Sequence, residues 1–523
     1  MRTRTLLSAF FFGLSWHACG AAQPGALIYQ TDFENPAARA AWVTSEYASW
    51  PSLATHGTVL TVTVPTTHAE APDAAARLKL GLTPYRGKRV NFFCRAKAER
   101  VTKPHDSWNG IKFMLYYRTH SKGEQWESLC PAPFGSFDWK PLAFQLTLPD
   151  DIGEAELTLG LQDSCGRVSF DDVRLELDKQ QMIVRPQPMR NPPPAFTGHI
   201  QPRLRGAMVE CEFNDANLRT LGQEWGANLI RWQITRAWGE TGKNRDLAEY
   251  DRWLDGRLAE LDQVLEACTR YGMKAVIDLH TPAGGRYEDQ SLAMFYEKIY
   301  ADAFVRMWEK IARRYKGNPS VWAYDLVNEP TQSSPVPEGL DNYWGLQIRA
   351  ARAVRAIDPD TAILFEVDDW DSPGGFRFVA PVDIPRVVYQ VHMYEPHAFT
   401  HQKVESSTVP ELRYPGLIDG VPVNKETLRK TLQPVRDFQL AYNVAIYVGE
   451  FSAIRWAPGA CDYLRDCIDI FEEYGWDWSY HAFREWDGWS VEHGSDISSH
   501  EPASAPTDRQ RLLRGWFGKN RSP

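Results

Sequence analysis

The sequence lacks the marks of several large classes of protein. Positive charge is in deficit, with 58 Lys and Arg against 67 Asp and Glu and a formal net charge of −9, which disfavours nucleic acid and anionic membranes as partners. No glycine-rich phosphate turn follows the first strand expected in the C-terminal part, so nucleotide binding has no support. No CxxC pair or Cys/His cluster has the spacing of zinc ligands, and we expect neither a metal nor another cofactor.

Long apolar runs are also missing. Residues 6–16 form an apolar run behind Arg2 and Arg4, and small residues follow it, as in an export signal. This run is well short of the roughly 20 residues that span a bilayer. We expect cleavage after Ala22, which makes residues 1–22 a signal peptide and leaves a secreted or periplasmic monomer without membrane attachment. Cys19 leaves a lipid-anchored precursor as the alternative.

Cysteine is scarce as well. Of the eight cysteines, Cys19 lies in the expected signal peptide, and the remaining seven cannot all pair within one chain. At least one therefore stays free unless subunits are bridged. We expect structural rather than catalytic cysteines, and the sequence leaves the pairing of any disulfide open.

Proline, in contrast, is concentrated in one segment. Five prolines fall within the fourteen residues 185–198, and each fixes φ and removes a backbone donor. Such a stretch favours extended geometry, so we expect a stiff linker at 178–198 between two folded domains. A chain of 523 residues also exceeds the usual size of a single domain.

Upstream of this linker, residues 26–177 are predicted to form a β-sandwich of the jelly-roll kind. Short β-rich runs alternate with Gly, Pro and Asp turns, and no long helical pattern interrupts them. The runs are 59–64, 90–94, 111–117, 142–148, 157–161 and 168–177.

Downstream of the linker, residues 199–523 alternate between apolar strand candidates and helical patterns. Eight strands are expected, at 204–209, 228–232, 274–279, 322–327, 362–367, 387–392, 444–448 and 476–482. Helical patterns occupy 250–271, 293–315, 343–356, 425–442, 463–474 and 508–517. Eight strand–helix units predict an α/β fold of the (β/α)8 TIM-barrel type, with an open doubly wound sheet as the alternative.

Polar side chains end five of the eight expected strands. Active sites of TIM barrels lie at the carboxyl ends of the strands, so these side chains are the candidates for catalysis. They are Arg231, Asp278 with His280, Asn328 with Glu329, His392 with Tyr394, and Glu450. Because Glu329 and Glu450 are three strands apart, both carboxylates are expected to face one pocket at the barrel mouth.

These strand ends resemble the cellulase family known as family 5 of the glycoside hydrolases. The resemblance covers residues 205–493 and rests on 229–231 (Leu-Ile-Arg), 278–280 (Asp-Leu-His), 326–330 (Leu-Val-Asn-Glu-Pro), 392–394 (His-Met-Tyr) and 448–451 (Val-Gly-Glu-Phe). It implies that Glu329 is the acid/base and Glu450 the nucleophile of a retaining hydrolase, which needs two carboxyl groups about 5–5.5 Å apart. It also implies that Asn328 binds the sugar 2-hydroxyl and that His280 and His392 line the cleavage subsite.

The chemistry of these residue types fits that division of roles. A nucleophile must stay ionised, and Arg231 and the Tyr394 hydroxyl are suited to hold Glu450 as an anion through charge-assisted hydrogen bonds. Glu329 must then carry the proton. Once Glu450 is esterified its negative field vanishes, and Glu329 can act as a base toward water.

Aromatic side chains are the expected surfaces for stacking on sugar rings, since 20 Trp and 21 Tyr are many for this length. The family commonly ends strand eight with a Trp beneath the sugar, and Trp486 is our choice for that place. Trp370, after strand five, is a further stacking candidate. Glu485 is a third carboxylate able to tune the other two.

The N-terminal region is similar, in residues 160–162 and 168–175, to the closing strands of jelly-roll carbohydrate-binding modules of secreted polysaccharidases. If it binds glycan, the candidates for stacking are Trp42, Trp50, Trp108 and Trp126. The alternative is a spacer domain without affinity for sugars.

We expect an exported enzyme that cleaves internal bonds of β-1,4-glucan. Alternatives are a β-mannanase or another β-glycan hydrolase, exo action set by the long insert 394–424, transfer to a sugar acceptor, and a non-catalytic glycan-binding protein. A zinc hydrolase that uses His392, His397 and His401 is a further alternative, which loss of activity on chelation would reveal.

Overall fold

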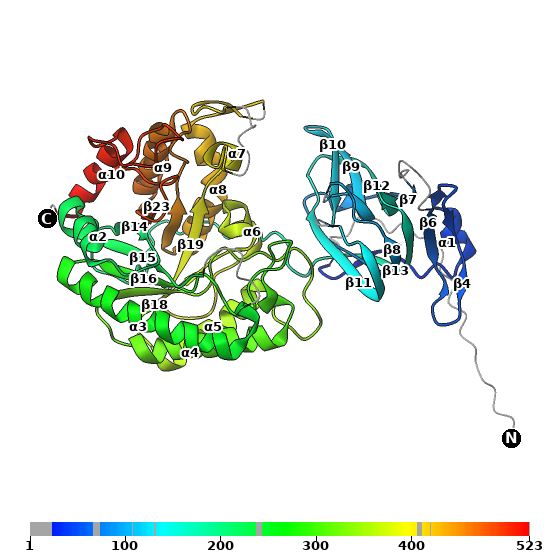
Figure 1. Cartoon of the computed structure of the whole chain (residues 1–523), viewed down its shortest axis with the longest axis horizontal. Coiled ribbons are helices and arrows are strands. Elements are labelled where there is room, and N and C mark those ends of the chain that lie inside the picture. Colours follow the sequence, from blue (N-terminus) through cyan, green and yellow to red (C-terminus); the bar gives the residue numbers. More distant parts are fainter. Residues whose placement is uncertain are drawn as a thin grey trace, which may run out of the picture. The chain divides into compact units, whose positions relative to one another are not determined.

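The computed structural model describes residues 23–65, 74–106, 108–129, 132–236, 243–404, 411–418 and 420–521. The chain forms two compact units, Met1–Gln181 and Met182–Pro523 (Figure 1). The expected signal peptide at 1–22 lies outside the described residues. No helix within these ranges is long and apolar enough to cross a membrane.

The first unit contains two antiparallel sheets. One has the order β11-β8-β13-β6-β3, with β1 paired to β13, and the other has the order β10-β9-β12-β7-β2. The strands are β1 (Leu27–Thr31), β2 (Val43–Thr44), β3 (Ala48–Ser49), β6 (Leu60–Val64), β7 (Ala74–Leu80), β8 (Arg89–Val101), β9 (Gly110–Thr119), β10 (Gly123–Ser128), β11 (Gly135–Thr147), β12 (Ile152–Gln162) and β13 (Gly166–Leu177). The hairpin of β4 (Ser52–Leu53) and β5 (Gly57–Thr58), the helix α1 (Pro36–Ala40) and the turn η1 (Thr83–Tyr85) complete the unit.

Alternation of side chains along the strands explains why this region folds as packed sheets. In β9, Phe113 and Leu115 are fully buried, whereas Met114 and Tyr116 are only partly buried. The inward side chains of both sheets form one hydrophobic core. The β-rich N-terminal region predicted from the sequence is confirmed. It also includes β7 and β10, whose Ala-rich and polar sequences had not indicated strands.

The second unit is a closed barrel of eight parallel strands. Its order is β14-β15-β16-β17-β18-β19-β22-β23, and β23 pairs with β14 to close the ring. The strands are β14 (Arg205–Val209), β15 (Leu229–Gln233), β16 (Lys274–Asp278), β17 (Val321–Asp325), β18 (Ala362–Phe365), β19 (Val387–Met393), β22 (Ile446–Phe451) and β23 (Asp477–Phe483). The predicted TIM barrel is confirmed, and the alternative of an open sheet is excluded.

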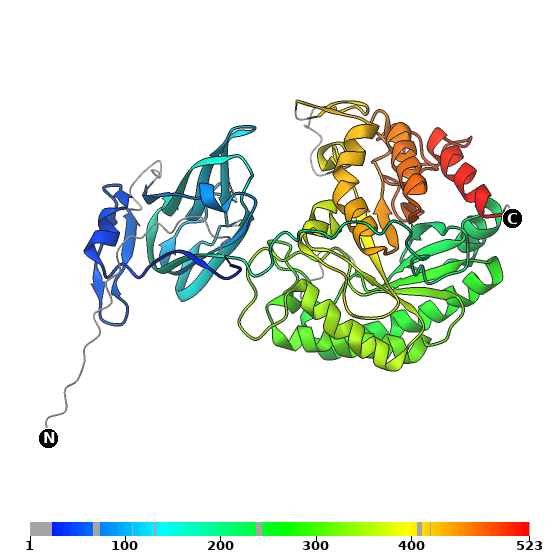
Figure 2. The same ribbon diagram turned by 180° about the vertical axis from the view of Figure 1, so that it is seen from behind.

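Helices surround this barrel in both views (Figures 1 and 2). They are α2 (Asp215–Arg219) continued by η2 (Thr220–Trp225), α3 (Leu247–Tyr271), α4 (Lys298–Tyr315), α5 (Tyr343–Ile357), α8 (Lys425–Tyr442), α9 (Ala460–Tyr474) and α10 (Asp508–Gly518). Shorter elements are η3 (Lys243–Arg245), η4 (Ala293–Phe295), α6 (Asp368–Asp371), η5 (Pro373–Phe378), α7 (His397–Thr400), β20 (Gly416–Ile418), β21 (Val421–Val423) and η6 (Lys519–Arg521). Helix α3 illustrates the local signals, because the Asp246 side chain caps two N–H groups at its start and left-handed Gly272 ends it.

The proline-rich segment packs on the barrel in its later part. The carbonyl oxygen of Thr197 accepts a hydrogen bond from the Trp322 indole at 2.9 Å. His199 Nε2 then meets Oδ2 of Asp477, the first residue of β23, at 2.8 Å. These contacts anchor the segment at the end of the barrel where the strands begin, whereas the sequence alone had indicated only a spacer.

The cysteines form no disulfide among the residues that the structure describes. The free thiols are Cys94, Cys165, Cys211, Cys268, Cys461 and Cys467. All except Cys211 are buried, where they pack as small apolar side chains. Cys130 lies outside the described residues.

Candidate active site

The polar side chains predicted at the strand ends lie at one end of the barrel. Because the strands are parallel, their carboxyl ends meet at a single mouth. The side chains are Arg231 on β15, His280 after β16, Asn328 and Glu329 after β17, His392 on β19, Tyr394 after β19 and Glu450 on β22.

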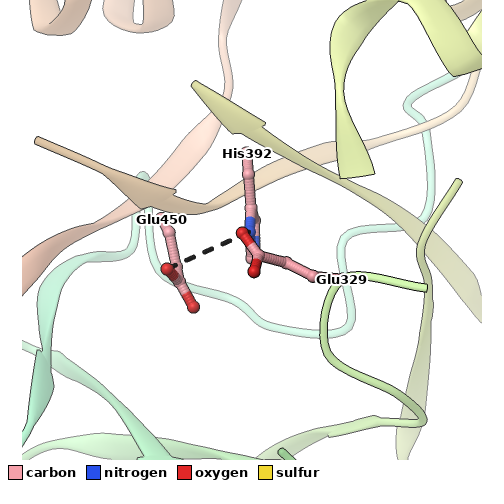
Figure 3. A group of neighbouring side chains, drawn as sticks. All are labelled: Glu329, His392 and Glu450. Carbon is pink, nitrogen blue, oxygen red and sulfur yellow. Dashed lines mark hydrogen bonds and ion pairs between the residues drawn. The ribbon is translucent and has the colours of Figure 1, made fainter. Parts of the chain in front are cut away.

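Glu329, His392 and Glu450 form the centre of this group. One oxygen of each carboxylate and one nitrogen of His392 lie within 4.8 Å of one another. His392 Nδ1 is 3.0 Å from Oε1 of Glu329 and 4.0 Å from Oε2 of Glu450. In Figure 3 the two carboxylates approach each other from the loop after β17 and from β22, beside the His392 ring. Carboxylate oxygens no more than 4.8 Å apart suit a pair that divides nucleophilic attack and proton donation, whose carboxyl groups lie about 5–5.5 Å apart.

Arg231 is fully buried beneath these groups. Its Nη1 donates to Oε1 of Glu450 at 2.5 Å, and its Nη2 donates to Oδ1 of Asn328 at 2.9 Å. Two aspartates also lie against the guanidinium, since Nε donates to Asp325 at 2.9 Å and Nη2 lies 3.2 Å from Asp278. One guanidinium therefore orients both Glu450 and Asn328.

Glu450 is held as an anion. The Tyr394 hydroxyl donates to its Oε2 at 2.9 Å, and His481 Nδ1 lies 3.4 Å from the same oxygen. Burial on its own raises the pKa of Glu450, but the surrounding positive groups, His392 and His481 first among them, outweigh burial and hold that pKa well below its usual range. Burial and the charge of Glu450 raise the pKa of Tyr394, so its hydroxyl keeps the proton that it donates.

His280 is tied to Asp278 at the end of β16. Its Nδ1 lies 2.8 Å from Oδ2 of Asp278. Burial lowers the pKa of His280, but the charge of Asp278 more than compensates, and the pKa is raised above its ordinary value. Asp278 therefore fixes the ring and favours its charged form.

Glu485, the third carboxylate expected near the site, joins it through His481, which the sequence had not indicated. His481 lies on β23, makes a short hydrogen bond with the Tyr394 hydroxyl, and has Nε2 3.0 Å from Oε2 of Glu485. Burial lowers the pKa of His481, but Glu485 and Glu450 raise it overall. The Ser479 hydroxyl donates to the carbonyl oxygen of Gly449 on β22, so Ser479 faces the inside of the barrel. Side chains two residues apart on a strand point to the same face, so His481 faces inward as well.

The two tryptophans chosen for sugar stacking lie farther out. Trp486 is 42% exposed and packs edge-on against Trp456 and Trp489, with ring centroids 6.0 and 5.9 Å away. On strand eight, the side chain beside Glu450 is that of His481, whose Nδ1 lies 3.4 Å from Oε2 of Glu450. Trp370 is 37% exposed and covers the guanidinium of Arg286 at 4.8 Å from its ring centroid.

Two groups of described side chains are close enough to share a metal ion. They are Glu329 with His392 and Glu450, and Glu366 with Asp371 and His392. Within the described residues, the three histidines of the zinc alternative form no such group. His397 and His401 stack on each other with ring centroids 3.9 Å apart, and burial lowers the pKa of His401 to about 3.

Similarity to known proteins agrees with this geometry. Residues 196–487 match the family described as Cellulase (glycosyl hydrolase family 5). The chain belongs to this family. It is therefore a glycoside hydrolase, and retention of anomeric configuration is general to family 5.

Individual relatives of this family 5 enzyme match about half of its length. Endoglucanase C of Acetivibrio thermocellus is 29% identical over 254 residues, which cover 43% of this chain and 72% of that protein. Cellodextrinase A of Ruminococcus flavefaciens is 26% identical over 303 residues, which cover 54% of this chain and 84% of that protein. A crystal structure described as a glycoside hydrolase aligns with a TM-score of 0.49 and 25% identity over 61% of this chain and 99% of that chain.

Proposed function

We propose that this family 5 hydrolase cleaves internal β-1,4-glucosidic bonds, with Glu450 as nucleophile and Glu329 as acid/base. The observation that carries the proposal is the approach of the two carboxylates to within 4.8 Å, with Glu450 held as an anion. The names of the endoglucanase and the cellodextrinase support a β-1,4-glucan as substrate. An extracellular or periplasmic polysaccharide also fits the export signal expected at 1–22.

In the first step the Glu450 carboxylate attacks the anomeric carbon, and the bond from that carbon to the glycosidic oxygen breaks. Its electron pair stays on the oxygen, which takes the proton of Glu329 and departs as a neutral hydroxyl group. The product is a glycosyl ester of Glu450. Asn328, which Arg231 fixes at 2.9 Å, is assigned to the sugar 2-hydroxyl, where its hydrogen bond strengthens in the transition state.

In the second step Glu329, now ionised, takes a proton from a water molecule whose oxygen attacks the anomeric carbon. The ester bond breaks and Glu450 leaves as a carboxylate. Two inversions at one carbon give net retention. His392, 3.0 Å from Oε1 of Glu329, is assigned to keep that carboxyl group oriented in both steps.

The other predicted residues are assigned to substrate binding. His280, His392 and Tyr394 surround the sugar at the point of cleavage. Trp370 is assigned to the leaving side, because Arg286 beneath it also donates to the carbonyl oxygen of Glu329 at 2.9 Å. Trp486 is assigned to an outer subsite, in keeping with its exposure.

Replacement of the nucleophile tests this proposal. Glu450→Ala should lose hydrolysis of soluble β-1,4-glucan on the order of 10⁴-fold or more. Azide should restore turnover of an activated aryl β-glycoside and give the α-glycosyl azide, because azide enters through the space that the carboxylate vacated. For the intact enzyme, endo action predicts that viscosity falls much faster than reducing ends appear. Full activity of Glu450→Ala, or a β-azide from it, would contradict the assignment.

We further propose that the N-terminal unit binds the same kind of glycan in a groove on its second sheet. The groove has a volume of about 700 Å³ and is lined by β7, β9, β10, β12 and the turn before β9. Trp108 and Trp126 line it and are each 58% exposed, which suits flat faces that stack on sugar rings. Of the other two candidates, Trp42 is buried in the core and Trp50 packs against it.

The remaining lining of the groove suits sugar hydroxyl groups. Side chains that alternate outward from the core form its floor, including Tyr116 of β9 and Thr158 of β12. Arg77 and Glu156, 3.6 Å apart, add a donor and an acceptor on neighbouring strands. Lys112 donates to the carbonyl oxygen of Trp108 at 2.6 Å and so holds the backbone at that ring.

Affinity electrophoresis of the full chain in gels with soluble β-1,4-glucan tests the groove, in a Glu329→Gln background that limits hydrolysis. Trp108→Ala and Trp126→Ala should each weaken binding about 10-fold, which corresponds to about 1.4 kcal/mol of stacking. Trp139→Ala, a partly buried ring on β11 of the other sheet, is the control and should leave migration unchanged. Unaltered binding by the double variant at the groove would contradict the proposal.

A further inference from the structure

Glu329 has an unusual backbone conformation for a residue with a side chain. Its φ of 49° lies in the left-handed region, which L residues other than glycine rarely adopt. Pro330 follows it directly. Conformations of this kind persist where the surrounding structure holds them, and they gather at functional sites. The groups that hold Glu329 therefore bear on its proposed chemistry.

Glu366 holds the amide side of this turn. It follows β18, is fully buried, and accepts the backbone N–H of Glu329 on Oε2 at 2.5 Å. The backbone of Glu366 is itself fixed by Gln347 of α5, through bonds of 3.0 Å to its N–H and 2.8 Å to its carbonyl oxygen. The other carboxylate oxygen makes a short bond with Gln390 and lies 3.4 Å from Nη2 of Arg231. One side chain thus links the turn to the guanidinium that holds the nucleophile.

Arg286 holds the carbonyl side of the same turn. Its Nη2 donates to the carbonyl oxygens of Asn328 and Glu329 at 3.1 and 2.9 Å. Its Nη1 donates to the Gln290 carbonyl oxygen and the Thr331 hydroxyl, both at 2.9 Å. With these four bonds the guanidinium is fixed in place, so it can fix the turn.

We propose that Glu366 and Arg286 are positioning residues for the acid/base. A carboxyl oxygen of Glu366 accepts the N–H of Glu329, and the Arg286 guanidinium donates to the carbonyl oxygens of Asn328 and Glu329, so the backbone of this turn is held from both sides. The side chain of Glu329 is thereby directed toward His392 and the glycosidic oxygen. Both residues act through the backbone of Glu329, and the inference rests on its proposed role as acid/base.

The charge state of Glu366 does not decide this role. Burial first, and then Asp325 and Asp371, raise the pKa of Glu366 well above its usual value. Oε2 can accept the N–H of Glu329 whether or not the group is protonated. A glutamine at this position keeps an acceptor oxygen, whereas a leucine of similar size has none.

Kinetics with leaving groups of different basicity test the proposal in the full chain. A misplaced acid slows the departure of a sugar alkoxide far more than that of dinitrophenolate, which needs no proton. Glu366→Leu and Arg286→Met should lower kcat/KM on cello-oligosaccharides about 10²-fold. On dinitrophenyl β-cellobioside the loss should stay below about 10-fold. Glu366→Gln should recover most of the activity, and azide should accelerate Glu366→Leu on the activated substrate and yield the β-glycosyl azide.

Asp358→Asn is the matched control, because Asp358 is a fully buried carboxylate at the opposite end of β18. It should lower thermal stability and leave the ratio of the two substrates unchanged. Equal losses on both substrates in Glu366→Leu and Arg286→Met would overturn the proposal, as would failure of Glu366→Gln to recover activity. If Glu366→Leu does not fold, Arg286→Met decides. If Glu329→Gln itself shows no dependence on the leaving group, the proposed function fails instead.

Discussion

The two ends of strand β18 carry buried acidic side chains of opposite character. Asp358, before the strand, accepts four hydrogen bonds: from the Tyr324 hydroxyl at 2.8 Å, the Thr361 hydroxyl at 2.7 Å, and the N–H groups of Asp360 and Thr361 at 3.0 and 3.1 Å. Burial raises its pKa, but these bonds outweigh burial and lower the pKa overall. This carboxylate is stable in its charged form.

Asp371, after the strand, is less well satisfied. One oxygen accepts the N–H of Val367 at 2.8 Å, while the other, buried Oδ2, has no hydrogen-bond partner among the described residues. Burial raises the pKa of Asp371 well above its usual value, and nearby Asp325 and Glu329 add to the effect. Charge is thus costly at this end of the strand.

The same contrast holds for the barrel as a whole. The end of the barrel where the strands begin is here called the closed end. There, His199 and Asp477 pair at 2.8 Å, and Oδ1 of Asp477 accepts the N–H of Leu204 at 2.7 Å. In the described loops at the mouth, left-handed residues other than glycine are Gln290, Glu329, Asp369, Trp370, Asp371, Lys403 and Arg484. Acidic side chains at the closed end are satisfied by hydrogen bonds, whereas the mouth holds the buried carboxyl groups of Glu366 and Asp371, whose pKa values are raised, where the chemistry is proposed.

The largest effect on stability and activity is expected from the loss of Arg231, the cation among the buried carboxylates of the mouth. Arg231→Met leaves Glu450, Asp278 and Asp325 buried without their cation, so the free energy of unfolding should fall by about 3–5 kcal/mol and activity should be lost. Urea unfolding and glucan hydrolysis measure the two losses. Arg314→Met, which removes a partly exposed pair with Asp262, is the control and should cost less than about 1 kcal/mol. If Arg231→Met kept the stability and activity of the intact enzyme, the carboxylates at the mouth would not depend on this cation, and the contrast between the two ends would not hold.

A smaller effect, dependent on pH, is expected at His481. Its pKa is raised, so its positive charge next to Glu450 is fully present below about pH 6.5 and is lost as the pH rises through the raised pKa. His481→Asn should therefore lower kcat/KM by about 10–100-fold at acidic pH, the range expected for a charge-assisted hydrogen bond. The profiles of His481→Asn and the intact enzyme should converge at alkaline pH. A constant ratio across pH would show that the charge of His481 plays no part.

The smallest effects test the comparison most closely. The same replacement, Asp by Asn, should change the free energy of unfolding in opposite directions at the two ends of β18. Asp358→Asn should destabilise the barrel by about 1–3 kcal/mol through lost charge-assisted bonds. Asp371→Asn should stabilise it by about 1 kcal/mol at neutral pH, a shift of about 2 °C in Tm. In the intact enzyme, Asp371 lowers the free energy of unfolding only above its unfolded pKa of about 4. The stabilisation by Asp371→Asn should therefore vanish in more acidic solution. Scanning calorimetry at two pH values checks both signs, and equal signs at neutral pH would contradict the comparison.

The parts of the site that could be predicted were those marked by a change in polarity along the chain. Each barrel strand is an apolar run, and Asn328 with Glu329, Tyr394 and Glu450 stand where such runs end. The fold rule that parallel strands share one mouth then brought them together. No long-range contact had to be known for this step.

The residues that could not be predicted lie within the apolar stretches of the barrel strands, where no change in polarity marks them, or in loops away from the strand ends. Glu366 lies within the apolar stretch 362–367, and its partner is a backbone N–H that only the closed barrel brings near. His481 lies within the stretch 476–482, and its inward direction depends on the phase of the strand. Arg286 lies in a loop after β16, and the left-handed φ of Glu329 leaves no trace in composition.

Trapping the covalent intermediate tests the central claim most directly. A 2-deoxy-2-fluoro-β-cellobioside with a dinitrophenyl leaving group should form its glycosyl ester readily and hydrolyse it slowly, because fluorine destabilises both transition states while the leaving group favours the first. Mass spectrometry of the digested enzyme should find one fluorocellobiosyl group, on Glu450. A label on Glu329, Glu485 or any other residue, or turnover without a covalent adduct, would contradict the account.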